Sequence, residues 1–275
     1  MISIVKLDLI RIDRSTLRQT TAFLLRNEIE ILAEKVETQE EFDQCKLLGC
    51  KYFQGYFLNR PQTITGRRIP ESKLTILRLL SEIQKPDLEF RALETIISYD
   101  VSLSYKLIRL INSVFYGTRK NIGSLMQALT MLGLRQIKMW VSLIFLSRIE
   151  DKPRELLVTA MVRAKMSELL AGMLKYRDAD AGFTVGLFSV LDALLDMPLE
   201  EILASLPLSQ DINDALLKRE GRFGAILKII IAYEKGDWNE IARLQVPKEK
   251  VVLAYLESID WATSVGLELG KEEEG

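Results

Sequence analysis

The pattern of hydrophobic and polar positions changes in character near residue 60. Before that point, β-like apolar runs alternate with helix-like amphipathic segments, which predicts a strand–helix–strand–helix–strand series. The expected strands and helices cover residues 2–10, 16–26, 28–37, 39–48 and 51–58. Because strands alternate with helices, we expect the strands to pair in parallel.

Polar residues at the expected helix boundaries support this series. Thr38 and Glu41 form a Thr-x-x-Glu capping box for the second helix, and Gly49 stops that helix. At the start of the first helix, Ser15 is the preferred cap and Asp13 is the alternative. Three parallel strands alone leave an edge and a face uncovered, so we expect this part to be incomplete or to be covered by the helical remainder of the chain.

From residue 73 onward, hydrophobic residues recur at helical spacing with short polar breaks. Asp100 is an expected cap, Ser124 and Gln127 form a second capping box, and Gly133 ends the helix that follows this box. Further helices are expected at residues 134–149, 153–174, 183–196, 198–204, 209–218, 223–235 and 248–267. The predicted domains are a partial α/β segment at 1–60, a linker at 61–72 and an all-α domain at 73–275.

The predicted linker is rich in turn residues and has no apolar period. It contains Pro61, Gly66 and Pro70 together with Arg67 and Arg68. Two adjacent arginines are able to bind an anion, but exposed arginines in a linker are usually solvated. We therefore expect a solvated turn here.

The segment 182–203 is the apolar centre of the helical part. Apolar residues occupy nearly every helical angle, which predicts a buried helix wrapped by others. Gly182 and Gly186 belong to a stripe of small residues that would let a neighbouring backbone approach. A polar seam interrupts the apolar surface at Ser189, Asp192 and Asp196. A buried carboxylate is costly unless it is hydrogen-bonded, so we expect Asp192 to be a structural residue.

Composition narrows the chemistry that this chain can perform. The 275 residues carry a net charge of −1 and include no histidine. Ser-His-Asp and Cys-His nucleophilic systems and every His-ligated metal site are therefore excluded. The balanced charge gives no global field that attracts nucleic acid or an anionic membrane. Cys45 and Cys50 are expected to be small buried side chains in a reducing compartment, and we predict a cytoplasmic protein without a cofactor.

Several motifs stand in order in the helical part: Ile97-Ser98-Tyr99-Asp100, Leu107 to Ser113, Phe115-Tyr116-Gly117, Ala128 to Leu134 and Gly186-Leu187-Phe188-Ser189. Together they closely resemble the HDOD domain, a relative of the HD phosphohydrolases, over about residues 74–238. HD enzymes hold metals through His and Asp, and the two positions matching their adjacent His-Asp pair are Ser189 and Val190 here. The resemblance implies an all-α fold from which HD-type metal hydrolysis is lost.

Three further motifs stand in order near the N-terminus: Val5-Lys6-Leu7-Asp8, Ala33-Glu34-Lys35-Val36-Glu37-Thr38, and Gln54-Gly55-Tyr56 with Arg60-Pro61. They resemble the last third of an EAL domain, the barrel that hydrolyses cyclic di-GMP. By that resemblance Lys6 lies near the attacking water, Glu37 near the metal-ligand shell and Gln54 near the substrate. Lys35 stands where the family usually has glycine. The family's Glu-Ala-Leu strand and its metal-binding Asn, Glu and Asp residues precede the matched part, which implies a truncated, degenerate EAL domain without catalysis.

The expected fold is mainly α, with an all-α HDOD-like domain preceded by a small α/β remnant of an EAL-type barrel. This combination resembles a class of bacterial signalling proteins. We therefore expect a signalling adaptor that is not an enzyme and whose helical domain binds other signalling proteins, with a homodimer as one assembly. We expect neither nucleic acid nor a membrane as a partner.

Two alternatives remain open at the level of the sequence. The first is a receptor that binds cyclic di-GMP or another nucleotide without hydrolysis. The binding site would be the EAL-like remnant, with Lys6, Glu37 and Gln54, or a groove beside the seam from Ser189 to Asp196. The second is a phosphohydrolase whose metal ligands are carboxylates only. Its candidate ligands are Asp100, Asp192 and Asp196, because hard divalent cations accept oxygen ligands.

Overall fold

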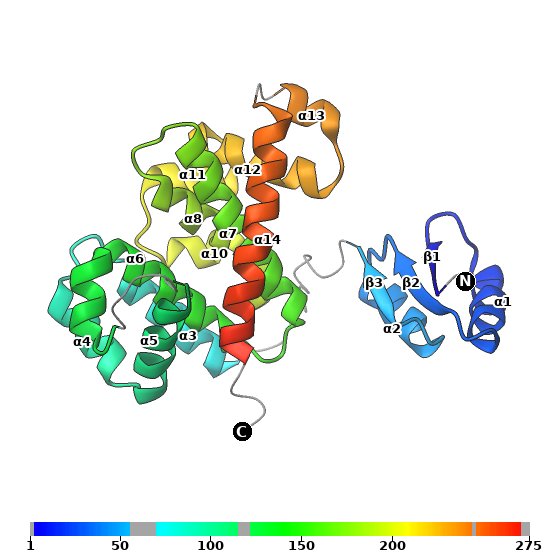
Figure 1. Ribbon diagram of the computed structural model, residues 1–275, viewed down its shortest axis with the longest axis horizontal. Helices are drawn as coiled ribbons and strands as arrows, with labels where there is room; N and C mark the ends of the chain where they lie inside the picture. Colours follow the sequence, from blue (N-terminus) through cyan, green and yellow to red (C-terminus); the bar gives the residue numbers. More distant parts are fainter. Residues whose placement is uncertain (1–2, 56–69, 115–121, 244–245, 271–275) are drawn as a thin grey trace. The chain divides into compact units, whose positions relative to one another are not determined.

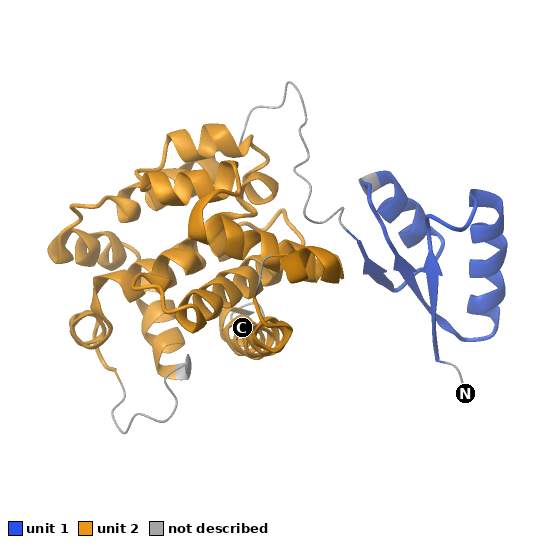
Figure 2. Cartoon of the chain, turned by 90° about the horizontal axis from the view of Figure 1, so that it is seen from above, with its two compact units in different colours: residues 1–60 blue, residues 61–275 orange. Residues whose placement is uncertain are grey.

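A computed structural model describes residues 3–55, 70–114, 122–243 and 246–270. The chain divides into two compact units, unit 1 (residues 1–60) and unit 2 (residues 61–275), each with its own hydrophobic cluster (Figure 2). Some motif and linker residues lie outside the described ranges, namely Tyr56, Arg60, Pro61, Gly66, Arg67, Arg68, Phe115, Tyr116 and Gly117. The chain is mainly helical, as predicted, while the assignment of unit 1 to an EAL-type barrel stays a prediction.

Unit 1 is a three-stranded sheet with two helices. In chain order its elements are β1 (Ile4–Asp8), α1 (Arg14–Arg26), β2 (Glu30–Glu34), α2 (Gln39–Leu47) and β3 (Tyr52–Gln54). The strands lie in the order β1-β2-β3 and both neighbouring pairs are parallel. The predicted parallel pairing is thus confirmed.

Alternation along the strands gives this sheet two different faces. Leu7, Ile31 and Ala33 are buried and pack with Leu17 and Leu24 of α1, on the face that the helices cover. The alternate positions point to the other face and keep part of their surface exposed. They are Ile4, Lys6, Asp8, Glu30, Leu32, Glu34, Tyr52 and Gln54.

The caps of the two helices in unit 1 are both side-chain caps, but one differs from the prediction. Asp13, and not Ser15, caps α1, because its carboxylate accepts the backbone N–H groups of Ser15 and Thr16 at 3.0 Å each. Ser15 lies inside the first turn and donates its hydroxyl to the same carboxylate. Thr38 and Glu41 form the predicted capping box of α2.

All the regular secondary structure among the described residues of unit 2 is helical. Its helices are α3 (Glu71–Gln84), α4 (Phe90–Ser98), α5 (Val101–Val114), α6 (Leu125–Ser147), α7 (Arg154–Met173), α8 (Ala179–Phe188), α9 (Leu191–Leu195), α10 (Leu199–Ala204), α11 (Gln210–Leu217), α12 (Gly221–Glu234), α13 (Trp238–Arg243) and α14 (Lys248–Gly270). The first of them begins inside the predicted linker. Helix α7 packs against α8, α12 and α14, and Figure 1 shows α14 running alongside it.

Helix α6 is long, apolar and interrupted. Gly133 has non-helical backbone angles (φ 78°, ψ 165°), which agrees with the predicted helix end at this residue. Among the described residues, α6 is the one helix long and apolar enough to cross a membrane. However, 56% of its most apolar window is buried inside the unit, so the hydrophobic core accounts for this composition.

The predicted helix at 183–196 is two helices, α8 and α9, and this corrects the prediction. Ser189 ends α8, and its hydroxyl donates to the carbonyl oxygen of Gly186 at 2.7 Å, the local hydrogen bonding that favours a helix end. Gly186 also has its predicted role, because a Cβ atom there would overlap the backbone of Arg163 in α7. The backbones of α7 and α8 therefore approach closely at this point.

Candidate functional site

The carboxyl ends of the three strands in unit 1 form one polar edge. Asp8, Glu34 and Gln54, the last residues of β1, β2 and β3, are in register with one another across the sheet. Lys6 lies two residues earlier on β1, on the same face and exposed. Because parallel strands bring their ends to a common edge, the sequence separation between these residues does not separate them in space. We call these strand ends, with the loop after β2, the strand-end edge.

Glu37 joins this edge from the loop between β2 and α2. It is exposed and directly precedes Thr38, the N-cap of α2. Its backbone N–H donates to the carboxylate of Glu41 at 2.8 Å, which holds the loop against the first turn of the helix. Glu37 and Gln54 thus lie at the carboxyl ends of the strands and Lys6 lies two residues before one of them, and their role in binding stays a prediction.

Gly55 is needed where the third strand leaves the edge. The N–H of Val36 donates to the carbonyl oxygen of Gln54 at 3.0 Å, so the loop after β2 lies directly against the end of β3. A Cβ atom on Gly55 would overlap the backbone of Val36. Only glycine allows this approach, which positions Gln54 beside the loop that carries Glu37.

An ion pair between Lys35 and Asp8 crosses from β1 to the residue after β2, with 2.6 Å between Nζ and Oδ2. Lys35 has a left-handed backbone (φ 61°), a conformation that favours the glycine found in the resembling family. The hydrogen bond from Lys35 holds the pKa of the Asp8 carboxyl below its usual value. The sequence analysis singled out Lys35 only as a departure from a pattern and missed its partner.

In unit 2, Ser189 and Val190, which the resemblance matches to the HD metal pair, lie beside a buried ion pair. Ser189 is 6% exposed and Val190 is 1% exposed. The Arg163 guanidinium, also buried, donates to the Ser189 hydroxyl at 3.2 Å and to both carboxylate oxygens of Glu234 at 2.7 and 2.6 Å. The Arg163 guanidinium therefore supplies a positive charge beside Ser189. Sequence analysis missed Arg163 and Glu234; the available signal was a charged residue on an otherwise core-facing part of α7.

Asp192 lies near this pair but in a different environment. Its carboxylate accepts the N–H of Ala193 at 2.8 Å. Burial raises the pKa of the Asp192 carboxyl, and the nearby guanidinium groups of Arg163 and Arg219 only partly offset that effect. These surroundings stabilise the ionised Asp192 carboxylate poorly, whereas those of Asp196 stabilise its ionised form.

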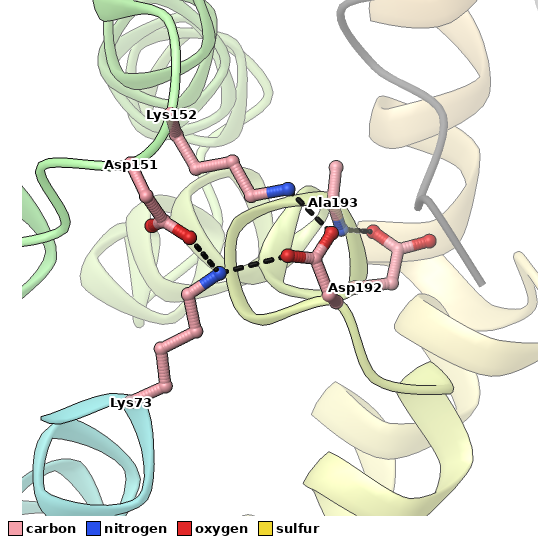
Figure 3. Close-up of polar contacts among 6 residues, drawn as sticks. Lys73, Asp151, Lys152, Asp192 and Ala193 are labelled. Atoms are coloured by element: carbon pink, nitrogen blue, oxygen red, sulfur yellow. Dashed lines mark hydrogen bonds and ion pairs between the residues drawn. The ribbon is translucent and has the colours of Figure 1, made fainter. Parts of the chain in front are cut away.

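Asp196, at the end of α9, belongs to a network of lysines and aspartates (Figure 3). The Nζ atom of Lys73, a side chain only 4% exposed, lies 2.8 Å from a carboxylate oxygen of Asp151 and 2.8 Å from one of Asp196. Lys152 pairs with the second oxygen of Asp196. Burial by itself would raise the pKa of the Asp196 carboxyl, but the hydrogen bonds from both lysines outweigh it and lower this pKa.

These contacts do not favour the carboxylate-metal alternative. Asp196 is neutralised by two lysines, and Asp100 caps α5 through the N–H of Leu103 and pairs with Arg148 at 2.6 Å. Within the described ranges, no group of three or more Asp, Glu, Cys or His side chains is placed to hold a metal ion. The described residues therefore do not fit the metal centre that hydrolases of the resembling families use.

Comparison with known proteins identifies a domain and two curated relatives. Residues 69–198 match the HDOD domain family. The chain is 36% identical over 212 residues to Cyclic di-GMP phosphodiesterase CdgJ of Vibrio cholerae, covering 76% of this chain and 49% of the relative. It is 32% identical over 269 residues to Uncharacterized protein YuxH of Bacillus subtilis, covering 94% of this chain and 65% of the relative. The chain thus spans about half the length of the first relative and less than two thirds of the second.

Two crystal structures share the fold. A provisionally named phosphohydrolase from Shewanella amazonensis SB2B matches with a TM-score of 0.54 and 15% identity, over 74% of this chain and 94% of its own. A provisionally named signal transduction protein from Marinobacter aquaeolei VT8 matches with a TM-score of 0.50 and 14% identity, over 94% of this chain and 84% of its own. At these identities the likeness concerns the fold alone.

The name of one curated relative contradicts one prediction made from the sequence. The expectation that the chain is not an enzyme rests on the absence of histidine and on the missing carboxylates. It is contradicted by the name of a curated relative, which is called a cyclic di-GMP phosphodiesterase. The absence of histidine excludes His-ligated metal sites, but it does not exclude hydrolysis by other groups.

Proposed function

We propose, from the premise that residues 69–198 form an HDOD domain, that this chain acts in cyclic di-GMP signalling. In this proposal the strand-end edge of unit 1 contacts the dinucleotide, and the HDOD domain makes the protein contacts that transmit the signal. One structural observation carries the first part: Gln54 ends β3, the loop with Glu37 follows β2, and Lys6 lies two residues before the end of β1 on the exposed face of the sheet. In α/β folds, ligands bind at the carboxyl ends of the strands.

The chemistry of the three side chains suits a guanine dinucleotide. The Lys6 ammonium offers a positive charge to a phosphodiester oxygen. Gln54 carries both a donor and an acceptor, and the Glu37 carboxylate accepts N–H groups of the kind that a guanine edge presents. The name of the Vibrio cholerae relative supports this choice of ligand, because that protein is named for cyclic di-GMP.

Calorimetric titration of the whole chain with cyclic di-GMP tests this proposal. Each of the variants Lys6→Ala and Gln54→Ala is expected to weaken binding about tenfold, which corresponds to about 1.4 kcal/mol. Lys51→Ala is the matched control, because Lys51 pairs with Glu30 at the opposite end of the sheet. No heat from the wild-type chain at high micromolar concentration would overturn the proposal, as would equal weakening by the control.

A second candidate function is hydrolysis of cyclic di-GMP, which the name of the curated relative favours. The assay incubates the purified chain with cyclic di-GMP and either Mg²⁺ or Mn²⁺ and measures the linear dinucleotide. Turnover that Lys6→Ala reduces, and that Lys51→Ala leaves unchanged, would assign hydrolysis to the strand-end edge. Turnover that neither variant changes would locate the reaction elsewhere and count against a substrate site at this edge.

Exposed tyrosines support the proposed protein contacts of the HDOD domain. Tyr99 is 87% exposed and Tyr105 is 58% exposed, although tyrosine side chains of this size are usually part-buried. Tyrosine is enriched in protein interfaces. Capture of partners from native cells by the whole chain, compared with Tyr99→Ala, tests this part. Phe23→Ala, which removes an exposed aromatic side chain of unit 1, is the control.

The proposal places the chain in the cytoplasm with other signalling proteins as partners, and with neither nucleic acid nor a membrane. It also allows a homodimer. Light scattering of the purified chain with and without cyclic di-GMP tests the assembly state. Sedimentation with anionic vesicles or with DNA would contradict the expected partners.

A further inference from the structure

Helix α2 ends in a six-residue motif that brings two cysteines together. The N–H of Cys50 donates to the carbonyl oxygen of Cys45 at 3.0 Å, and the N–H of Gly49 donates to that of Lys46 at 3.1 Å. Gly49 has a left-handed backbone (φ 89°). This pair of hydrogen bonds around a left-handed glycine is the Schellman arrangement of a helix C-terminus.

A Schellman arrangement frequently brings the side chains of its first and last residues together, and here both side chains are thiols. Cys45 and Cys50 are 1% and 6% exposed, and each thiol is near enough to the other to affect its pKa. Both belong to the hydrophobic cluster of unit 1. The backbone hydrogen bond keeps the two Cα atoms close, which is the first geometric requirement of a disulfide.

We propose that Cys45 and Cys50 are a redox modification site that forms an intramolecular disulfide with a low-molecular-weight disulfide as oxidant. One thiol loses its proton and attacks a sulfur of the oxidant, which releases one molecule of thiol and leaves a mixed disulfide. The second cysteine attacks that mixed disulfide and releases the second thiol. In balance, two protein thiols lose two protons and two electrons, and one oxidant disulfide becomes two thiols.

Burial determines how fast this site reacts. It raises the pKa of the Cys50 thiol to about 12 and that of the Cys45 thiol in the same direction, so the reactive thiolate is scarce in the folded state. Oxidation is therefore expected through local opening of unit 1, and mild urea should accelerate it. The disulfide is therefore expected to form during sustained exposure to an oxidant and to form little during a brief exposure.

The bond would connect α2 to the segment before β3, at the end of the sheet away from the strand-end edge. Cys45 lies near the end of α2, the helix that follows Glu37, and Cys50 lies two residues before the start of β3, the strand that ends at Gln54. A disulfide would tie the end of the helix to the start of the strand. This inference does not depend on the proposed function, because it concerns only the two thiols and their backbone.

Peptide mapping of the whole chain tests the proposal. The protein is incubated with oxidised glutathione, free thiols are blocked with a maleimide, and trypsin digestion follows without reduction. Trypsin cleaves after Lys35, Lys46 and Lys51, so the two cysteines fall on separate peptides, 36–46 and 47–51. The expected result is one species in which these peptides are joined with the loss of two hydrogen atoms, from a chain that remains monomeric under non-reducing conditions.

Three results would overturn the proposal: two blocked thiols per chain after long exposure to the oxidant, a stable glutathione adduct without joined peptides, or a bond between two chains. The variant Cys50→Ala serves as the matched control, because it removes one thiol and must abolish the joined species. The wild-type experiment decides the question even if that variant folds poorly. Repeating it in mild urea is expected to increase the rate of joining severalfold.

Discussion

Arg163 and Glu234 are 71 residues apart in the sequence and form a bidentate ion pair that joins α7 to α12. The side chain of Arg163 is 5% exposed and that of Glu234 is 19% exposed. The pair also holds the Ser189 hydroxyl between α8 and α9. Three segments of unit 2 are therefore coupled through one guanidinium.

Removing the acidic partner should be strongly destabilising. Glu234→Ala removes the carboxylate that binds two nitrogens of the buried Arg163 guanidinium, and we expect a loss of about 3–5 kcal/mol in the free energy of unfolding, measured by urea denaturation. Glu240→Ala is the control, because the Glu240–Arg243 pair is exposed, and its loss should cost less than about 1 kcal/mol. Equal effects of the two variants would show that the buried pair contributes no more than a surface pair.

The close approach of α7 and α8 gives a prediction for Gly186→Ala. The added methyl group overlaps the backbone of Arg163, so the two helices must separate, at a cost of about 1–3 kcal/mol or more. Gly172→Ala is the matched control: its Cβ meets no atom within 4 Å, and the same substitution should stabilise α7 by about 0.5 kcal/mol. Thermal melting of the two variants should therefore shift in opposite directions.

The lysine network predicts an acid-sensitive contribution from Asp196. Its pKa in the folded chain lies below that in the unfolded chain, which is about 3.9. Its contribution is fully present above that unfolded value and is lost as the pH falls through the folded value. Asp196→Asn, which tolerates the left-handed backbone, should cost about 1.5–3 kcal/mol at pH 7. The difference from wild type should shrink below about pH 4 in urea denaturation.

Asp260→Asn on the exposed surface of α14 is the control for that measurement. It should leave the acid dependence of stability close to that of the wild-type chain. A difference between Asp196→Asn and wild type that stays constant down to pH 2.5 would contradict the role given to Lys73 and Lys152.

Asp192 should respond to pH with the opposite sign. Burial raises the pKa of its carboxyl in the folded chain, so the neutral form is favoured and ionisation costs stability as the pH rises through the unfolded value toward the folded value. Asparagine does not ionise. Relative to wild type, Asp192→Asn should therefore become more stable as the pH rises from 3 to 7. A change in the same direction as that of Asp196→Asn would refute the environment described for Asp192.

The features that sequence analysis predicted correctly are mostly local. The Thr38 capping box, the Asp100 cap and the Ser124 cap depend on residues within one helical turn, and each occurs in the structure. The parallel sheet followed from the alternation of strands and helices, and the HDOD resemblance followed from ordered motifs. The preferred cap of α1 was wrong: the sequence favours Ser15, and the structure has Asp13. Both polar residues lie within the same turn, and a carboxylate accepts more hydrogen bonds than a hydroxyl.

The features that it missed depend on contacts between distant segments. Nothing in the spacing of residues near Arg163 indicates that Glu234 neutralises it, and nothing near Lys73 indicates two aspartates on other loops. The division of the predicted helix at Ser189 is the exception, because it reflects a local hydrogen bond from the Ser189 hydroxyl to the carbonyl oxygen of Gly186. The wrong prediction about enzyme activity had another origin, since ligand counting excludes only the mechanisms that need those ligands.

The backbone at Gly133 has a consequence for how α6 opens. Because its angles are not helical, the amides that follow it lack the acceptors four residues earlier that a continuous helix would provide. Amide hydrogens of Arg135 and Gln136 should therefore exchange with solvent deuterium much faster than those near Leu143 and Ile144 in the core. The first turns of α6 can then unfold while the buried part after Gly133 remains protected from exchange. The helix therefore behaves as two cooperative units.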